Sequence, residues 1–345
     1  MHKQDSLKTE KYDAYINRKR ISLLILLAVT VIASVLYMRV GSMKMSFTDI
    51  IRALVGTGEG KYRAAVMNIR LPRALAALLV GSVLGASGAV MQCVLRNPLA
   101  SASTLGVSQG AAFGAAVGIV VFGGGTITAS TAASTVSVSN PYLVTVFAFA
   151  FGSVSSLVVI GISGMRRNIG PGGLILAGTA LSAMFTGGST LLQYFADDNA
   201  LGAVVFWTFG NLGSAGWKDL AFLSVVGCAA LVYFIFNRWN YNAMEAGADR
   251  AVSLGVDARR IMLVSMAVCS LASATAVSFV GIISFVGLIA PHLVRFFTGN
   301  DHRFLIPGSA LAGALLLLVA DTVAKLIMPP AILPIGAIMS FVGGP

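Results

Sequence analysis

Long uncharged stretches alternate with short polar connectors along this chain. In the segment 70–110, two arginines flank a proline, 22 uncharged residues follow, and a cationic turn begins at Arg96. A bilayer core about 30 Å thick requires about 20 apolar residues per helix. The segment therefore predicts a membrane-crossing helix with polar residues at both ends.

The same pattern recurs and predicts an all-α integral membrane protein of about ten transmembrane helices. The polar residues 1–20 are expected to form a cytoplasmic amino-terminal segment, followed by one transmembrane domain over 21–345. The run 21–38 lacks a small-residue cleavage site, so we expect it to be retained as a helix rather than removed as a signal peptide. The predicted spans are 21–38, 64–95, 104–122, 142–163, 173–196, 217–236, 259–280, 282–298, 304–326 and 334 onward.

The cations predict the orientation. When the spans alternate across the membrane, fifteen of the 24 Lys and Arg residues, including Arg166 and Arg167, fall on the side of the amino terminus and nine on the other. Cytoplasmic connectors carry the excess of positive charge. We therefore expect a multi-pass protein of the cytoplasmic (inner) membrane with its amino terminus in the cytoplasm.

Composition supports a membrane protein and argues against other classes. Hydrophobic residues make up 57% of the chain and charged residues 11%, whereas soluble domains are about a quarter charged. The net charge of +11 does not indicate nucleic-acid binding, because no basic patch is interleaved with aromatic residues. The three cysteines are widely separated and have neither metal-ligand nor disulfide spacing, so we interpret them as packing residues.

Glycines recur every fourth residue in two predicted helices, at 81 and 85 and again at 106, 110, 114 and 118. This spacing places them near one helix face, where small residues allow close helix contact. Packing within the bundle is the favoured interpretation, and lining of a pathway is the alternative. A glycine-rich stretch at 56–62 lacks the spacing of a phosphate-binding loop. The chain is therefore expected to hold no nucleotide, cofactor or metal.

From Arg70 onward the chain contains several ordered, non-repetitive sequence blocks. They are RLPR (70–73), SGAVMQCVLRNPLA (87–100), LGVSQGA (105–111), LILAGTALS (174–182), GIISFVGLIAPHLVRFFTGNDHRFLIPGSALAGALLLLVADTVAK (281–325) and LPIG (333–336). These blocks resemble one family, the FecCD permeases, which are the membrane subunits of ATP-driven importers for ferric siderophores, haem and cobalamin.

The resemblance implies a type II ABC importer permease that moves a ferric siderophore by alternating access. Cobalamin, haem and molybdate are the alternative cargoes. The implied partners are a second permease (the same chain or a homologue), two ATPase subunits that bind ATP and Mg²⁺, and an extracytoplasmic binding protein. No catalytic role is implied for this chain.

The first group of residues implied by the resemblance is Arg70, Arg73 and Lys325, which match family positions that dock the acidic lobes of the binding protein. Fixed cations at helix ends steer an acidic partner and set its register. Lys325 also lies four residues after Asp321, so pairing on one helix face is an alternative role.

The second group forms two proline turns, defined as Asn97-Pro98-Leu99 and Gly170-Pro171-Gly172. Similar positions in the family close the path on the cytoplasmic side. Proline ends or breaks a helix irrespective of such a role, because it lacks a donor and restricts the preceding residue.

The third group lies in the loop 241–260, which predicts two short helices around Gly247 and Gly255. Permeases of this kind fit such a loop into a cleft of the ATPase. Ala248, Ala251 and Leu254 would supply a small apolar face, and glycine permits the tight turns. A merely solvated loop is the alternative.

Two embedded ionisable residues invite other functions. A secondary transporter requires carboxylates near the bilayer centre, and only Asp321 is a candidate. A membrane-embedded enzyme requires a cluster of catalytic groups, and the sequence shows none. We interpret His292 as a structural histidine. Only 13 residues remain from Leu333, the first residue of LPIG, so we expect the last helix to be incomplete.

Overall fold

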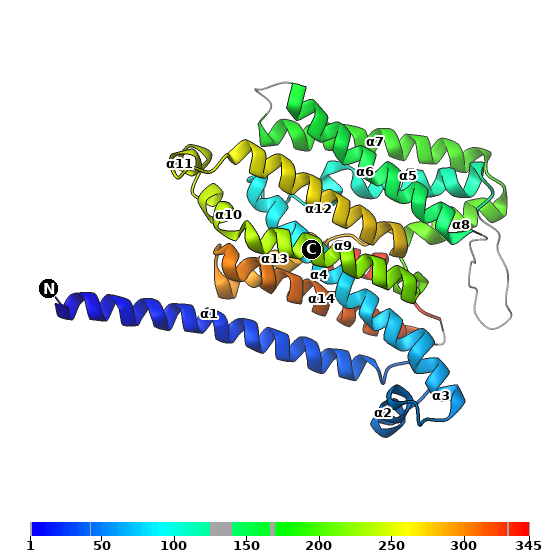
Figure 1. The fold of residues 1–345 in the computed structure, drawn as a ribbon. Coiled ribbons are helices and arrows are strands. Elements are labelled where there is room, and N and C mark those ends of the chain that lie inside the picture. The colour runs from blue at the N-terminus through cyan, green and yellow to red at the C-terminus, as the bar shows by residue number, and fades with distance from the viewer. Residues whose placement is uncertain (1, 42, 125–139, 166–169, 330, 345) are drawn as a thin grey trace.

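The computed structural model describes residues 2–41, 43–124, 140–165, 170–329 and 331–344, and the regular elements in these ranges are helices. Figure 1 shows long helices running side by side, with α1 along one edge of the bundle. The short helices α10 (Arg238–Glu245) and α11 (Ala248–Ser253) lie near the amino terminus, at what we call the proximal end. Helices α2 (Phe47–Val55) and α3 (Gly60–Ala65) lie at the opposite, distal end.

Seven stretches are long and apolar enough to cross a membrane within the described residues. Shorter apolar helices complete the set, and together they confirm the prediction of about ten membrane helices. The long helices are α1 (His2–Tyr37), α4 (Leu71–Val94), α6 (Pro141–Met165), α7 (Pro171–Phe195), α9 (Trp217–Phe236), α12 (Ala258–Val280) and α14 (His302–Ile327), and the shorter ones are α5 (Val107–Ala116), α13 (Val286–Thr298) and α15 (Ile335–Gly343).

Two connectors contain helices that the hydrophobic pattern does not predict. In the polar segment 41–63, Ser46 and Asp49 form a reciprocal capping box that begins α2, and Gly56 ends it in the left-handed conformation. Between α7 and α9, Asp197 caps α8 (Asp198–Thr208) by accepting from the Ala200 amide. Helix α2 thus begins from an end signal in a polar segment, whereas α8 combines its cap with the short apolar run 200–207.

Two helices also contain wider turns. A π turn at Val66–Arg70 joins α3 to α4, and a second at Val117–Val121 extends α5. The connector 123–140, which is rich in Gly, Ser and Thr, falls largely on residues 125–139, outside the described residues, as do Arg166 and Arg167.

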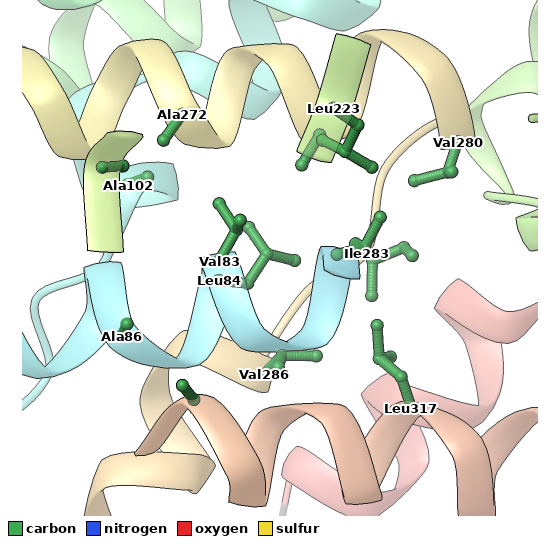
Figure 2. Packing of buried hydrophobic residues seen from close by; sticks show 14 of the residues in the cluster. Val83, Leu84, Ala86, Ala102, Leu223, Ala272, Val280, Ile283, Val286 and Leu317 are labelled. Carbon is green, nitrogen blue, oxygen red and sulfur yellow. The ribbon is translucent and has the colours of Figure 1, made fainter. Parts of the chain in front are cut away.

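Helix α4 lies at the centre of the bundle, and most of its side chains are buried. In Figure 2, Val83 and Leu84 of α4 lie on the side of the helix that faces Leu223 of α9, and Val286 of α13 lies on its opposite side. Leu317 of α14 closes the same cluster from another side. Because neighbouring helices cover α4 on several sides, a charged side chain on most of its faces would be buried. This explains why its run of uncharged residues is uninterrupted.

Glycine allows α4 to touch its neighbours backbone to backbone. A Cβ on Gly85 would lie 2.1 Å from the carbonyl oxygen of Ser309, and one on Gly88 would lie 1.8 Å from that of Gly287. The second glycine series does the same against α6, where a Cβ on Gly114 would lie 2.2 Å from the Phe147 oxygen. The spaced glycines therefore serve close helix packing.

We predict that Gly88→Ala destabilises the purified protein by about 1–3 kcal/mol, because the added methyl group must displace backbone atoms of α13. Gly161→Ala is the matched control, since a Cβ on this glycine of α6 meets nothing within 4 Å. The melting temperature measured in detergent should fall for Gly88→Ala and stay unchanged for Gly161→Ala. Equal melting temperatures would contradict the packing constraint.

Candidate functional site

A buried ion cluster at the distal end joins α1, α4 and α14. Arg73 donates Nε and Nη2 to the two carboxylate oxygens of Asp321, at 2.7–3.1 Å. Lys325 Nζ lies 3.1 Å from Asp321 Oδ2, and the Tyr37 hydroxyl donates to the same oxygen at 2.6 Å. The Lys325 ammonium also lies 3.6 Å from the centroid of the Tyr37 ring. One fully buried carboxylate thus holds two cations from two helices.

The structure confirms the predicted pairing of Lys325 with Asp321. Arg70, the third predicted docking cation, donates to the carbonyl oxygens of Met38 and Met43 and fixes the connector after α1. All three cations are buried, with donors engaged inside the chain. Their docking role stays a prediction, and the structure gives each of them an anchoring role.

At the proximal end, a cavity of about 620 Å³ separates the end of α4 from α12. Val94 and Arg96 line it from α4 and its turn, and Pro171 lines it from the start of α7. Val252 and Gly255 of the loop 241–260 complete the wall. The fold therefore brings the second proline turn and the predicted ATPase loop to one cavity.

The two proline turns end and begin helices as predicted. Helix α4 stops at Val94, and Arg96 then takes the left-handed conformation with φ 46°. The Asn97 side chain accepts from the Leu99 amide at 2.9 Å, which stabilises the turn, while Leu99 itself is exposed. In the second turn, Pro171 is the first residue of α7. Closure of a path by these turns stays a prediction.

The loop 241–260 forms two short helices, as predicted. Gly247 (φ 120°) separates α10 from α11, and Gly255 (φ 81°) precedes α12. Ala251 is fully buried within the chain, so it contributes nothing to an exposed face. Leu254 is 69% exposed and Val252 is 63% exposed, and Val252 is an apolar surface residue that the sequence analysis did not single out. Gly172 is exposed, and the side chain of Ala248 lies outside the described residues.

A polar network that the sequence analysis missed lies beside this loop. The Asn242 side chain donates to Asp301 at 3.0 Å and accepts from the His302 amide at 2.8 Å. Arg303 donates to both oxygens of Asp301. Burial raises the pKa of Asp301, but hydrogen bonds from Arg303 and Asn242 outweigh it and lower the pKa to about 2. Asp301 is therefore ionised at physiological pH.

A second cavity, of about 380 Å³, shares Arg96 with the first. Asn97 and Pro98 border it, together with Glu245 and Arg295. His292 also lines it, with Nδ1 3.1 Å from the Leu288 carbonyl oxygen one turn earlier, which fits the predicted structural histidine. The proximal end thus contains two neighbouring cavities with mixed polar walls.

A bundle of apolar helices with an exposed two-helix loop at one end defines a polytopic helical membrane protein. Residues 26–345 match the model of the FecCD transport family. The chain belongs to this family, whose members are permease subunits of ABC transporters. ATP hydrolysis in such transporters resides in a separate subunit, and membership implies a paired permease.

Curated relatives span nearly the whole chain. A provisionally named ABC transporter permease of Methanocaldococcus jannaschii is 46% identical over 97% of this chain and 95% of its own length. The hemin transport system permease protein of Yersinia pestis is 34% identical over 94% of this chain and 92% of its own. The iron(3+)-hydroxamate import system permease protein of Bacillus subtilis is 36% identical over 81% of this chain and 69% of its own.

The fold is also similar to a solved structure. That structure is described as an inward-facing conformation of a metal-chelate type ABC transporter, itself provisionally assigned. It is 29% identical, covers 94% of this chain and 97% of the matched chain, and superposes with a TM-score of 0.81. Sequence and fold thus lead to the same class of protein.

We predict that Asp321→Asn destabilises the protein by about 3–5 kcal/mol, because it leaves Arg73 and Lys325 as uncompensated buried cations. Tyr37→Phe removes only one hydrogen bond to the carboxylate and should cost about 1 kcal/mol. Unfolding of both variants in detergent would be followed by denaturant titration. A cost for Asp321→Asn no larger than that for Tyr37→Phe would show that the cluster is not an anchor.

Proposed function

We propose that this chain is the permease subunit of an importer that moves a ferric siderophore across the cytoplasmic membrane by alternating access, powered by a partner ATPase. The observation that carries the proposal is the family match across residues 26–345. One relative is named for iron(3+)-hydroxamate import, which supports a ferric siderophore. Another is named for hemin transport, so haem is the second candidate cargo, followed by cobalamin and molybdate.

In the proposed orientation, the bundle spans the inner membrane and its proximal end faces the cytoplasm. Arginines concentrate at this end, which agrees with the excess of cytoplasmic positive charge in membrane proteins. They border the cavities and the loop 241–260, as Arg96, Arg250, Arg259 and Arg295 do. The distal end then faces outward.

We propose that Val252 and Leu254 insert into the cleft of the ATPase. They are the exposed apolar residues of α11 and its end, and Asp249 and Arg250 flank them as charged rim residues. Gly247 and Gly255 set the angle of α11 by their positive φ values. Because Val252 of α11 and Pro171 line the same cavity, movement of the loop is transmitted to the second proline turn.

The proposed assembly contains a second permease, either the same chain or a homologue, two ATPase subunits and an extracytoplasmic binding protein. Two cations around one carboxylate leave the distal cluster with a net positive charge beneath the outer surface. Arg70 adds another cation beside it. We propose that this field attracts acidic groups of the binding protein. On the proximal side, exposed Leu99 is suited to contact the second permease at the closed path.

A secondary transporter fits this structure less well. Asp321, the carboxylate that such a mechanism would use, is held by Arg73, Lys325 and Tyr37 near the distal end of α14. An ion carrier must release its counter-charge during each cycle, and a carboxylate with two fixed cationic partners has no free position for an ion.

We predict that cells lacking only this gene lose uptake of a labelled ferric siderophore. Ferric siderophores, haem and cobalamin would be offered in parallel, and the intact gene should restore the loss. Loss of haem or cobalamin uptake alone would reassign the cargo. Unchanged uptake of all three in a strain without a second permease would overturn the proposal.

We predict that Leu254→Glu abolishes co-purification with the ATPase, because a carboxylate cannot enter an apolar cleft without losing its hydration. Transport-coupled ATP hydrolysis should fall at least about tenfold, which corresponds to about 1.4 kcal/mol. Val55→Glu is the matched control, since Val55 is 73% exposed on α2 at the distal end. Normal ATPase binding by Leu254→Glu would contradict the assignment of the loop.

A further inference from the structure

Three potential metal ligands from three helices meet at the proximal end. Cys93 lies in the last turn of α4, Glu245 is the last residue of α10, and His302 is the first residue of α14. One ligand atom from each lies within 4.8 Å of the other two. Cys93 and His302 are buried, whereas Glu245 is exposed. The spacing of the cysteines in the sequence does not indicate this cluster, because its three members come from distant segments of the chain.

The hydrogen bonds around His302 prepare one ring nitrogen for a ligand. Asn242 Nδ2 donates to Asp301, so Asn242 Oδ1 faces His302 as an acceptor and lies 3.1 Å from Nδ1. Nδ1 must therefore carry the proton, and Nε2 keeps its lone pair. Nε2 is buried and has no hydrogen-bond partner among the described residues. A metal-binding histidine usually donates its other ring N–H to an acceptor of this kind.

The other two ligands are also oriented by neighbours. Asn300 donates to Glu245 Oε1 at 2.7 Å, which orients the carboxylate. The Cys93 thiol donates to the Tyr241 carbonyl oxygen, with Sγ 3.4 Å away. Metal binding would replace the S–H bond by an S–metal bond and release the thiol proton to solvent.

We propose that Cys93, Glu245 and His302 form a binding site for a borderline divalent transition-metal ion, of which Zn²⁺, Fe²⁺ and Co²⁺ are examples. A sulfur, nitrogen and oxygen donor set suits such ions, whereas Mg²⁺ and Ca²⁺ prefer oxygen ligands. The site departs from the sequence-based expectation that this chain holds no metal. It is separate from the proposed cargo, which is a whole chelate.

The geometry requires only a small adjustment. Ligand atoms around a tetrahedral ion lie about 3.5 Å apart, and the exposed side chain of Glu245 has the freedom to close the difference. Glu245 borders the second cavity, from which water can supply a fourth ligand. Arg96 and Arg295 line that cavity as well, and their charge opposes a cation. The site is therefore suited to reversible binding rather than to permanent occupancy.

A bound ion would tie the end of α10 to α4 and α14. Glu245 stands two residues before Gly247, where the chain turns into α11. This further step rests on the proposed function: a metal that fixes α10 would restrain the loop that contacts the ATPase. The binding site itself is independent of that step and is tested on the permease alone.

The test is a titration of purified full-length protein in detergent with Co²⁺, whose sulfur-to-cobalt charge-transfer band reports thiolate coordination. We expect one Co²⁺ per chain, a charge-transfer band, and displacement of Co²⁺ by Zn²⁺. Cys93→Ser should abolish the band. Asn242→Ala should weaken binding about 10- to 100-fold by freeing the orientation of His302. Glu245→Gln, which replaces a carboxylate ligand by a neutral amide, should weaken it at least as much.

Two controls use the same residue types. Cys269→Ser and His292→Asn should keep both the band and the affinity, since neither residue belongs to the three-ligand site. Because Glu245 is exposed, Glu245→Gln should fold normally, and its loss of Zn²⁺-dependent thermal stabilisation provides a second readout. The proposal is overturned if Co²⁺ gives no band or if the band survives Cys93→Ser. It is also overturned if Zn²⁺ does not stabilise the protein while inorganic phosphate, an anion that Arg96 and Arg295 would attract, does.

Discussion

Backbone contact between α4 and its neighbours α13 and α14 is the constraint on which this bundle depends. Lipid tails are as apolar as leucine side chains, so helices in a membrane gain little from burying apolar surface against each other. Close approach, with its many van der Waals contacts, must supply the association. Gly81, Gly85 and Gly88 provide it along one side of α4. With this axis fixed, Arg73 is placed at the distal end and Cys93 at the proximal end.

The two ends of the axis carry different kinds of polar chemistry. At the distal end, Asp321 is saturated by Arg73, Lys325 and Tyr37, and the arrangement is rigid. At the proximal end, two cavities separate the helix ends, and buried polar atoms such as His302 Nε2 have no partner among the described residues. A structure of this kind is expected to move where its contacts are incomplete. The proposed path would therefore open and close at the proximal end while the distal cluster holds the helices together.

Local signals in the sequence predicted most of the fold and part of the candidate site. Apolar runs marked the spans, Gly247 and Gly255 marked the two short helices of the loop, and the spacing of Asp321 and Lys325 marked their pairing. Helix α2 escaped prediction because its signal is a cap at Ser46 rather than an apolar run. The Cys93–Glu245–His302 cluster escaped because its members lie on α4, α10 and α14, and only tertiary packing brings such positions together. Arg73 as the bidentate partner of Asp321 is missed for the same reason.

The π turns at Val66–Arg70 and Val117–Val121 allow the distal ends of two helices to take up or lose one residue. A π turn holds one residue more than an α turn, and each residue corresponds to about 100° of rotation around the helix. Gain or loss of one residue is absorbed there by interconversion of the two kinds of turn, without moving the glycines of α4. Insertions or deletions during evolution can therefore rotate the distal segments one residue at a time. The distal face can change in this way while the packed glycines of α4 keep their register.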